Sequence, residues 1–181
     1  MKLMVASDIH GSAHCCKELL EAYEREKPQR LVLLGDLLYH GPRNELPSGY
    51  APKEVIALLN GKKEELLCVR GNCDCEVDQM VLEFPMLADY AYLYVDGIEL
   101  YITHGHLQNP ATPPFLKTGS ILLNGHTHVP KCQEYKDFIY MNPGSVSIPK
   151  EGSKCSYMVY EDRHFEWKTL GGNTYMEYKY C

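Results

Sequence analysis

The first seventy residues alternate short apolar runs with segments whose apolar positions follow a helical period. Each of three runs is followed within two residues by Gly or Asp, which is typical of buried strands; they are residues 3–6, 31–34 and 66–69. Residues 12–26 have helical spacing that Pro28 ends, and Pro52 begins a second helix running to about Leu59. A Gly- and Pro-rich loop over 39–52 precedes that helix. Strands that alternate with helices predict right-handed crossovers and a parallel sheet.

The second half of the chain alternates apolar and polar positions with the period of half-buried strands. Residues 90–95 and 98–103 flank Asp96-Gly97, a dipeptide typical of a two-residue hairpin turn. Further strands are predicted at 121–123, 131–135, 138–141, 156–160, 163–169 and 174–180. The pattern predicts a βαβ front half and an antiparallel, β-rich rear half. No repeat or linker divides the chain, so we expect one α/β domain over residues 1–181.

Composition and charge narrow the class of protein. The chain has 181 residues, and its 18 Lys and Arg against 24 Asp and Glu give a net charge of −6. No apolar run approaches the ~20 residues of a membrane span, and the apolar run near Met1 is too short for a secretory signal. We therefore expect a cytoplasmic protein that does not bind membranes. The acidic balance argues against duplex nucleic acid but allows a phosphate ligand held by bound metal.

The eight cysteines favour a reducing compartment. Their spacing is irregular, and no Cys-x-x-Cys pair is present. We therefore expect reduced thiols, neither a disulfide framework nor a zinc ribbon.

The chain ends with a predicted hairpin that is rich in aromatic residues, including Tyr175, Tyr178 and Tyr180. Two interpretations stay open. The hairpin closes the second sheet, or its exposed aromatic edge pairs with another chain. The second interpretation gives a homo-oligomer, a dimer or a tetramer.

Polar clusters that can bind metal follow five of the predicted strands. They are Asp8-Ile9-His10-Gly11, Gly35-Asp36, Gly71-Asn72-Cys73-Asp74, His104-Gly105-His106 and Gly125-His126-Thr127-His128. Open α/β sheets bind ligands at the carboxyl ends of their strands, so these clusters could converge on one edge. Asp8 and His10 are two residues apart and point the same way in an extended segment, as do His126 and His128.

Considered alone, each cluster has a simpler explanation. A single Asp before a helix is commonly an N-cap, and a single His at a strand end commonly bonds neighbouring backbone. Five such clusters in order favour a metal site instead. Four His, two Asp and one Asn suit Mn, Fe or Zn, and seven ligands suit two metals about 3.5–4 Å apart that share one carboxylate.

Over roughly residues 1–150, the chain resembles the calcineurin-like metallophosphoesterase superfamily. The resemblance rests on the order of the motifs, which is Asp-x-His, Gly-Asp, Gly-Asn, His and Gly-His-x-His. Four segments are similar to a compact bacterial branch of phosphodiesterases within it: Ser7–Ser12, His40–Asn44, Arg70–Asp74 and Asn142–Lys150. The resemblance implies a four-layer α/β/β/α sandwich of two packed mixed sheets flanked by helices.

The resemblance also implies a role for each metal-binding residue. Asp8, His10 and His128 would hold one metal, Asn72, His104 and His126 the other, and Asp36 would bridge them. A hydroxide between the metals would attack phosphorus in line with the leaving oxygen. The ligand set favours Mn²⁺, and Fe, Zn or Ni are also compatible. Two aspartates leave such a site net positive, which favours a phosphate anion.

The candidate catalytic residues are Asp36, Asn72, His106 and Cys73. His106 could face the phosphate, or it could bond nearby backbone. Cys73 stands where the wider family has a His that protonates the leaving oxygen, and a thiol with a pKa near ~8.5 is a poor match to that task. Packing, phosphate contact and proton transfer all stay open for Cys73.

The candidate substrate-binding residues are Arg43, His40, Cys73 and Asn72. Arg43 could bind two phosphate oxygens, or it could form an ion pair within the loop. Tyr50 could stack on a base, and Arg70 is expected to be structural.

We expect a two-metal hydrolase of a small phosphodiester. One alternative is a phosphomonoesterase or protein phosphatase, which Cys73 and the small size of the chain disfavour. Another is an inactive binding scaffold of the same fold, as in a related retromer subunit. The complete ligand set argues against a scaffold.

Overall fold

The front half forms the βαβ units that the apolar pattern predicts. The computed structural model describes residues 1–181, and its first elements are β1 (Leu3–Ala6), α1 (Ala13–Glu26), β2 (Arg30–Leu33), α2 (Pro52–Asn60) and β3 (Leu66–Cys68). Ser12 caps α1, because its hydroxyl accepts a hydrogen bond from the Cys15 N–H at 3.2 Å. The one unpredicted helix, α3 (Glu76–Gln79), is a single turn and too short to produce a visible period.

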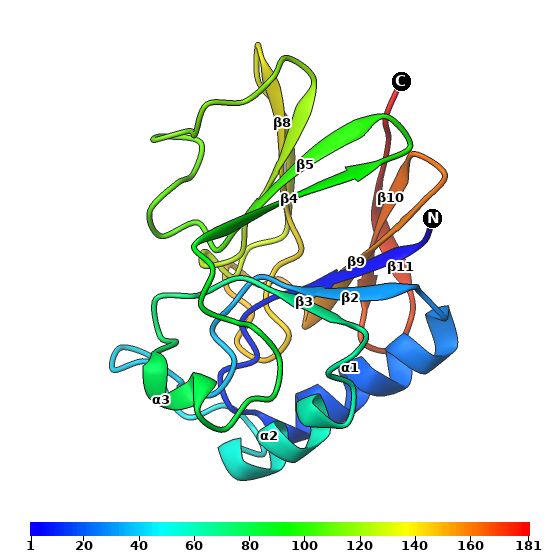
Figure 1. Ribbon diagram of the computed structural model, residues 1–181. Helices are drawn as coiled ribbons and strands as arrows, with labels where there is room; N and C mark the ends of the chain where they lie inside the picture. Colours follow the sequence, from blue (N-terminus) through cyan, green and yellow to red (C-terminus); the bar gives the residue numbers. More distant parts are fainter.

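The remaining strands complete two mixed sheets (Figure 1). They are β4 (Tyr90–Val95), β5 (Ile98–Thr103), β6 (Ser120–Leu123), β7 (Lys131–Glu134), β8 (Phe138–Asn142), β9 (Ser156–Glu161), β10 (His164–Thr169) and β11 (Thr174–Lys179). The six-stranded sheet has the order β11-β10-β9-β1-β2-β3, and the five-stranded sheet has the order β4-β5-β6-β8-β7.

The prediction of an antiparallel rear half is wrong for three strands. β5, β6 and β8 are parallel to one another. The long segment 104–119 joins β5 to β6, and a connection of that length returns the chain to the same end of the sheet. Alternating polarity marks a strand but carries no information about its direction.

The terminal hairpin does not close the second sheet, so that interpretation is wrong. β10 pairs with β9, which pairs with β1, and this places the hairpin in the six-stranded sheet. Its last tyrosines reach across to the other sheet: Tyr178 donates to Glu134 Oε1 at 2.7 Å and Tyr180 to the Gly119 carbonyl at 2.8 Å. The homo-oligomer stays a prediction.

The two mixed sheets pack face to face, which confirms the two packed sheets of the predicted sandwich. Sixteen buried residues fill the space between them. Trp167 is fully buried there, and its indole N–H donates to the Asn142 carbonyl at 2.6 Å. This packing holds the carboxyl ends of β1 and β5 in a fixed relation.

Helices cover only one outer face of the sandwich. In Figure 1, α1 and α2 lie below the six-stranded sheet, and 24 buried residues form the core on that side. The outer face of the five-stranded sheet carries no helix, because segment 104–119 contains Pro110, Pro113 and Pro114. Leu116 of that segment packs instead on Tyr101, Leu122 and Tyr140. None of the helices has the length and apolar character that crossing a membrane requires.

An ion-pair cluster fastens the end of α1 to the six-stranded sheet. Glu26 accepts hydrogen bonds from Lys168 Nζ at 3.1 Å and the Tyr157 hydroxyl at 3.0 Å, and Lys2 Nζ lies 3.3 Å away. Burial alone disfavours the charged carboxylate, but these partners outweigh it and lower the pKa of Glu26. A carboxyl group whose pKa is lower in the folded than in the unfolded state stabilises the fold. The stabilisation is complete at pH values above the unfolded-state pKa, and it is lost as pH falls through the folded-state pKa.

We expect Glu26→Gln to lower the free energy of unfolding at pH 7 by about 1–3 kcal/mol, because Lys168 and Lys2 each lose one of their two anionic partners. Urea unfolding at pH 7 and at pH 3 measures the effect, which should shrink at the lower pH because the wild-type carboxyl takes up a proton as pH falls through its lowered pKa. Glu24→Gln is the matched control, since Glu24 pairs with Lys62 at the surface and should change stability by less than about 1 kcal/mol. An equal loss at both pH values would contradict the role of the charge.

Candidate metal centre

Seven potential metal ligands converge at the carboxyl ends of five strands. Asp8 and His10 follow β1, Asp36 follows β2, Asn72 follows β3, His104 follows β5, and His126 and His128 follow β6. In each of two groups, the ligand atoms of all three residues lie within 4.8 Å of one another. The groups are Asp8, His10 and His128, and Asp8, Asp36 and His104. The sheet edge therefore gathers residues from positions 8 to 128 into one site.

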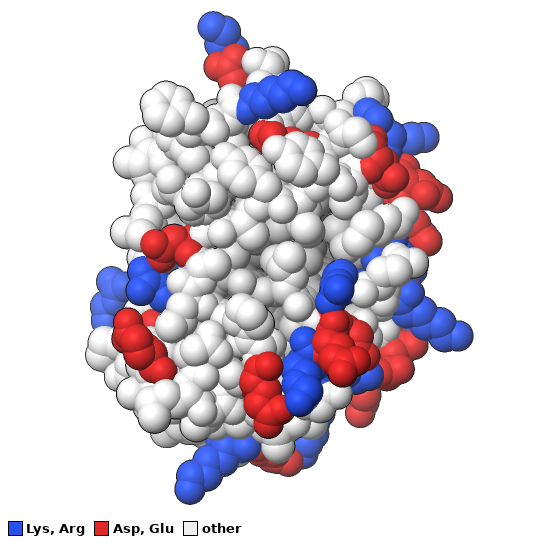
Figure 2. Space-filling view, viewed as in Figure 1, with Lys and Arg blue, Asp and Glu red and all other residues white.

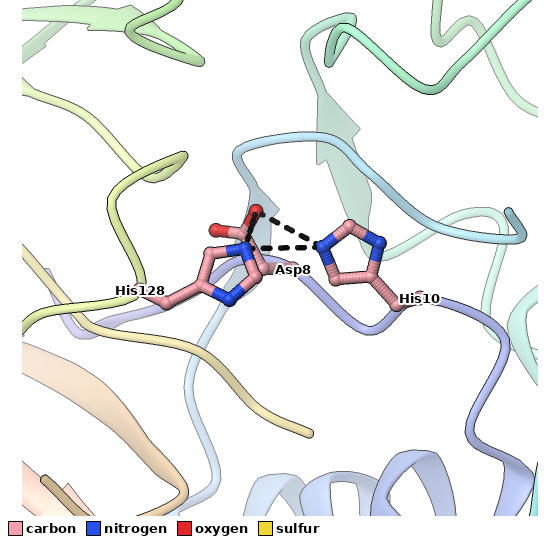
Figure 3. A group of neighbouring side chains, drawn as sticks. All are labelled: Asp8, His10 and His128. Atoms are coloured by element: carbon pink, nitrogen blue, oxygen red, sulfur yellow. Dashed lines mark hydrogen bonds and ion pairs between the residues drawn. The ribbon is translucent and has the colours of Figure 1, made fainter. Parts of the chain in front are cut away.

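Figure 3 shows the first group, in which the Asp8 carboxylate lies between two imidazoles. Asp8 Oδ1 is 3.5 Å from His10 Nε2 and 3.2 Å from His128 Nε2, and the two Nε2 atoms are 3.1 Å apart. In the neighbouring group, His104 Nε2 is 3.4 Å from Asp36 Oδ2 and 3.1 Å from Asn72 Oδ1. Asp36 Oδ2 is also 3.7 Å from His10 Nε2, so this carboxylate faces both groups.

The backbone is strained at the residues that face the site. Five of the seven adopt a left-handed conformation, with φ between 50° and 65°: Asp8, His10, Asp36, His126 and His128. Non-glycine residues seldom adopt it, and each costs about 1–3 kcal/mol unless its surroundings enforce it. The left-handed turns let side chains immediately after a strand project toward a common centre.

Two glycines allow strands to approach the carboxylates closely. A Cβ on Gly71 would lie 2.0 Å from Asp36 Oδ1, and a Cβ on Gly125 would lie 1.9 Å from Ser7 Oγ and 2.7 Å from Asp8 Oδ2. Only glycine fits where these backbones pass. This explains the Gly before Asn72 and the Gly before His126 in two of the sequence motifs.

Backbone carbonyls fix the orientation of three imidazoles. His10 Nδ1 donates to the Tyr39 carbonyl at 2.8 Å, His104 Nδ1 to the Leu34 carbonyl at 2.7 Å and His128 Nδ1 to the Ile148 carbonyl at 2.6 Å. A carbonyl only accepts, so Nδ1 carries the proton and Nε2 of the neutral ring presents a lone pair.

A divalent cation fits this arrangement of donors. The Nε2 lone pairs of His10 and His128 face each other beside Asp8 Oδ1, a buried oxygen with no hydrogen-bond partner. Lone pairs and a carboxylate at such distances repel one another unless a proton or a metal lies between them. Nitrogen and oxygen donors without thiolate suit Mn, Fe or Zn.

The charges of the site are coupled. Burial alone would raise the pKa of Asp8, but His10 and His128 lower it well below its usual range. Burial likewise opposes a charged His104, yet the hydrogen bond with Asp36 and the nearby carboxylates raise its pKa to about 9. A proton and a metal therefore compete for the same imidazole, so metal affinity falls as pH falls.

A polar cavity of about 410 Å³ opens over these residues. Arg43 and Asn44 line it from the loop over 39–52, and Lys150 lines it from the other side. Sequence analysis missed Lys150, although it ends one of the segments that carried the family resemblance. Two cations in a cavity with almost no apolar lining suit an anionic ligand.

Cys73 also lines this cavity, beside Asn72, whose side-chain N–H contacts Cys73 Sγ at 3.2 Å. Burial and the neighbouring Asp36 raise the pKa of the Cys73 thiol, so it stays protonated near neutral pH. A thiol that releases its proton with such difficulty is a poor general acid.

His40 and His106 lie outside this cavity. His40 packs edge-on against Tyr39 at 4.8 Å and Tyr50 at 5.4 Å between ring centroids, so Tyr50 contacts a histidine inside its own loop. The His106 ring is 5.4 Å from that of His104, and burial together with the His104 charge lowers the pKa of His106. The roles of His40 and His106 stay predictions. Arg70 forms an ion pair with Asp89 at 2.7 Å, which is a structural contact.

Asp74 lies beside the candidate ligands, and sequence analysis assigned it no role. Its buried carboxylate accepts the N–H groups of Asp36 at 2.8 Å, Leu37 at 2.9 Å and Gly71 at 2.7 Å. Asp36 Oδ1 in turn accepts the Cys73 N–H at 2.8 Å. The two aspartates thus fasten the ends of β2 and β3 together, and the only signal in the sequence is the last residue of Gly71-Asn72-Cys73-Asp74.

Comparison with known proteins gives consistent matches. A model of the calcineurin-like phosphoesterase superfamily domain matches residues 1–163. The phosphodiesterase YfcE of Escherichia coli K12 is 48% identical over 157 residues, which are 87% of this chain and 85% of that protein. A solved structure of YfcE, described as a phosphoesterase from E. coli, has a TM-score of 0.97 at 42% identity and covers 100% of both chains. Wild-type Vps29 of Entamoeba histolytica, solved in complex with Zn²⁺, shares only the fold, with a TM-score of 0.62 at 16% identity over 100% of both chains.

Proposed function

Because the chain belongs to the calcineurin-like phosphoesterase superfamily, we propose that it hydrolyses small phosphodiesters with the help of two divalent metal ions. Membership makes it a metal-dependent phosphoesterase. The position of Asp36 Oδ2 is the observation that supports the two-metal proposal. This oxygen lies 3.4 Å from His104 Nε2 and 3.7 Å from His10 Nε2. A carboxylate in that position suits a bridge between two cations.

In the proposal, two sets of three residues each hold one metal, and Asp36 joins them. The sets are Asp8, His10 and His128, and Asn72, His104 and His126. The bound pair would supply a water that ionises near neutral pH and positive charge beside the phosphate. The chain keeps its ligands in place through the backbone: the His126 N–H holds Asp8 Oδ2 at 3.0 Å, and the Cys73 N–H holds Asp36 Oδ1 at 2.8 Å.

Arg43 and Lys150 would bind the phosphate oxygens of the substrate. Both line the cavity over the candidate ligands, and a guanidinium can contact two oxygens of one phosphate. On the face shown in Figure 2, charged side chains of both signs lie mostly around the rim, and no basic patch suited to duplex nucleic acid is visible there. A small phosphodiester is the substrate that this charge distribution favours.

Two other functions are disfavoured by particular residues. A phosphomonoesterase that releases a poor leaving group needs a proton donor, and this chain has the thiol of Cys73 where the wider family has a His. A binding scaffold that lacks activity has no need of a complete ligand set. A homo-oligomer and a cytoplasmic location remain parts of the proposal that follow from the sequence.

The deciding experiment compares an aryl phosphodiester with the matching aryl phosphomonoester on metal-reconstituted protein. We expect the diester to be hydrolysed faster. Preference for the monoester, or absence of turnover with Mn²⁺, Fe²⁺, Zn²⁺ and Ni²⁺, would overturn the proposal.

Removal of metal should abolish activity, and added Mn²⁺ should restore most of it, because oxygen and imidazole donors form the site without thiolate. Activity assays after chelation and readdition, together with elemental analysis, measure this. Fewer than two metals per active chain would argue against the two-metal site.

Cys73→Ala should leave metal content intact and reduce hydrolysis of an activated aryl diester by less than about tenfold, because a good leaving group needs no proton. Cys73→His should accelerate diesters with poor leaving groups selectively. A rate series over leaving groups of different pKa tests both variants. If Cys73→Ala lost as much activity on the activated diester as Asp36→Asn, a secondary role for Cys73 would be wrong.

A further inference from the structure

A second cavity of about 540 Å³ adjoins the one over the candidate metal ligands. The two cavities share His126 and Thr127, so they lie side by side at the end of β6. The walls of the second cavity come from segment 104–119, the end of β6 and the β7–β8 hairpin. The proposed function gives this space no role.

A buried hydrogen-bond acceptor without a partner lies in the wall of this cavity. Asn124 is 1% exposed, and its amide nitrogen donates to the Thr103 carbonyl at 3.1 Å and the Leu123 carbonyl at 3.0 Å. Carbonyls only accept, so the amide orientation is fixed and Oδ1 cannot exchange places with the nitrogen. Asn124 Oδ1 is buried and has no partner within the chain. Such an oxygen favours a ligand that donates an N–H or O–H.

A glycine packs directly against the Asn124 amide. Gly105 also lines the cavity, and a Cβ at this position would lie 3.1 Å from Asn124 Cγ and 3.3 Å from its Oδ1. A larger residue would press on the amide, and the φ of +111° also favours glycine.

The rest of the lining suits a flat, neutral group. Pro110, Val129, Tyr135 and Tyr140 offer apolar or aromatic surface. One cation and one anion, Lys131 and Glu151, complete the lining, so the cavity has no net charge to attract a second phosphate. The neighbouring cavity differs, because Arg43 and Lys150 make it cationic. The volume lies within the ~300–1,000 Å³ typical of small-molecule sites.

We propose that the second cavity binds one ester substituent of the diester, and that this substituent is a planar neutral group with a hydrogen-bond donor, as in the base of a nucleoside. The inference rests on the proposed function, since the phosphate must lie over the metal ligands for its substituent to reach the cavity. The base would donate to Asn124 Oδ1 and lie against Tyr135 and Pro110.

Two diesters with the same leaving group test the proposal: adenosine 5′-(4-nitrophenyl phosphate) and methyl 4-nitrophenyl phosphate. In both, water adds to phosphorus as the bond to 4-nitrophenolate breaks, so only the retained substituent differs. We expect kcat/KM to be at least tenfold higher for the adenosine diester. Tyr135→Ala should reduce that ratio at least threefold, because Tyr135 is 37% exposed and can be removed without opening the core. Tyr175→Ala, a tyrosine of β11 that is 40% exposed, is the matched control and should leave the ratio unchanged.

Binding of adenosine alone to chelator-treated protein gives a readout that does not depend on hydrolysis. Titration followed by NMR should show saturable binding that Tyr135→Ala weakens. Active enzyme with equal kcat/KM for both diesters, or absence of saturable adenosine binding, would overturn the cavity assignment while leaving the proposed function intact. Saturable adenosine binding weakened by Tyr135→Ala, in protein that hydrolyses no diester, would support the cavity and refute the proposed function.

Discussion

Asp36→Asn should reduce turnover of a phosphodiester by roughly a thousandfold or more, which corresponds to about 4 kcal/mol of transition-state stabilisation. The substitution keeps the shape of the side chain and removes the negative charge that faces both groups of ligands. Asp36 Oδ2 lies 3.4 Å from His104 Nε2 and 3.7 Å from His10 Nε2, so its charge acts on both proposed metals. Repulsion between two cations then loses its counter-charge, and at least one metal should bind more weakly.

Three measurements on Asp36→Asn separate loss of chemistry from loss of fold: kcat/KM on an activated diester, metal content, and the melting temperature. Asp137→Asn makes the same chemical change on an exposed turn and should leave all three unchanged. Full activity of Asp36→Asn with two bound metals would refute the whole model of the site.

Local sequence patterns predicted the elements well, because each element has a local cause. The dipeptide Asp96-Gly97 forms the turn between β4 and β5 as predicted, and Ser12 caps α1. No local pattern in the sequence determines which sheet the terminal hairpin joins. β10 joins β9 because Phe165 and Trp167 pack into the core between the sheets, and that packing depends on residues from the whole chain.

The convergence of the polar clusters could be predicted for a physical reason. Parallel strands end on the same edge of a sheet, so the residues after β1, β2 and β3 must lie near one another. The two sheets pack face to face and bring the ends of β5 and β6 to the same place.

The lining of the cavity could be predicted only in part, since it depends on the course of loops. The loop over 39–52 turns Arg43 into the cavity and His40 into an aromatic cluster with Tyr39 and Tyr50, although both residues follow Asp36 closely. Lys150 reaches the cavity because its backbone N–H bonds the His128 carbonyl at 3.2 Å. Spacing along the chain does not distinguish Arg43 from His40, and it does not indicate that Lys150 lines the cavity.

Asp74→Ala should lower the free energy of unfolding by about 3–5 kcal/mol, because it removes the acceptor of three backbone N–H groups. The N–H groups belong to Asp36, Leu37 and Gly71, and the carboxylate that binds them is buried. Asp74→Asn keeps one oxygen acceptor and should lose less stability. Asp78→Ala is the control, since Asp78 accepts the Cys75 N–H at 2.8 Å in the exposed helix α3 and should cost only about 1 kcal/mol.

Loss of Asp74 should also reduce activity in molecules that remain folded. The Asp36 N–H and the Gly71 N–H are both fixed by Asp74 Oδ2, and a Cβ at position 71 would already touch the Asp36 carboxylate. A shift of a few tenths of an ångström between β2 and β3 therefore moves the carboxylate between the proposed metals. Measured well below the melting temperature, Asp74→Asn should show a lower kcat and weaker metal binding, whereas Asp78→Ala should match the wild type. Wild-type kcat and metal content in folded Asp74→Asn would reduce Asp74 to a stabilising residue, because positioning of Asp36 would then depend on the Cys73 N–H alone.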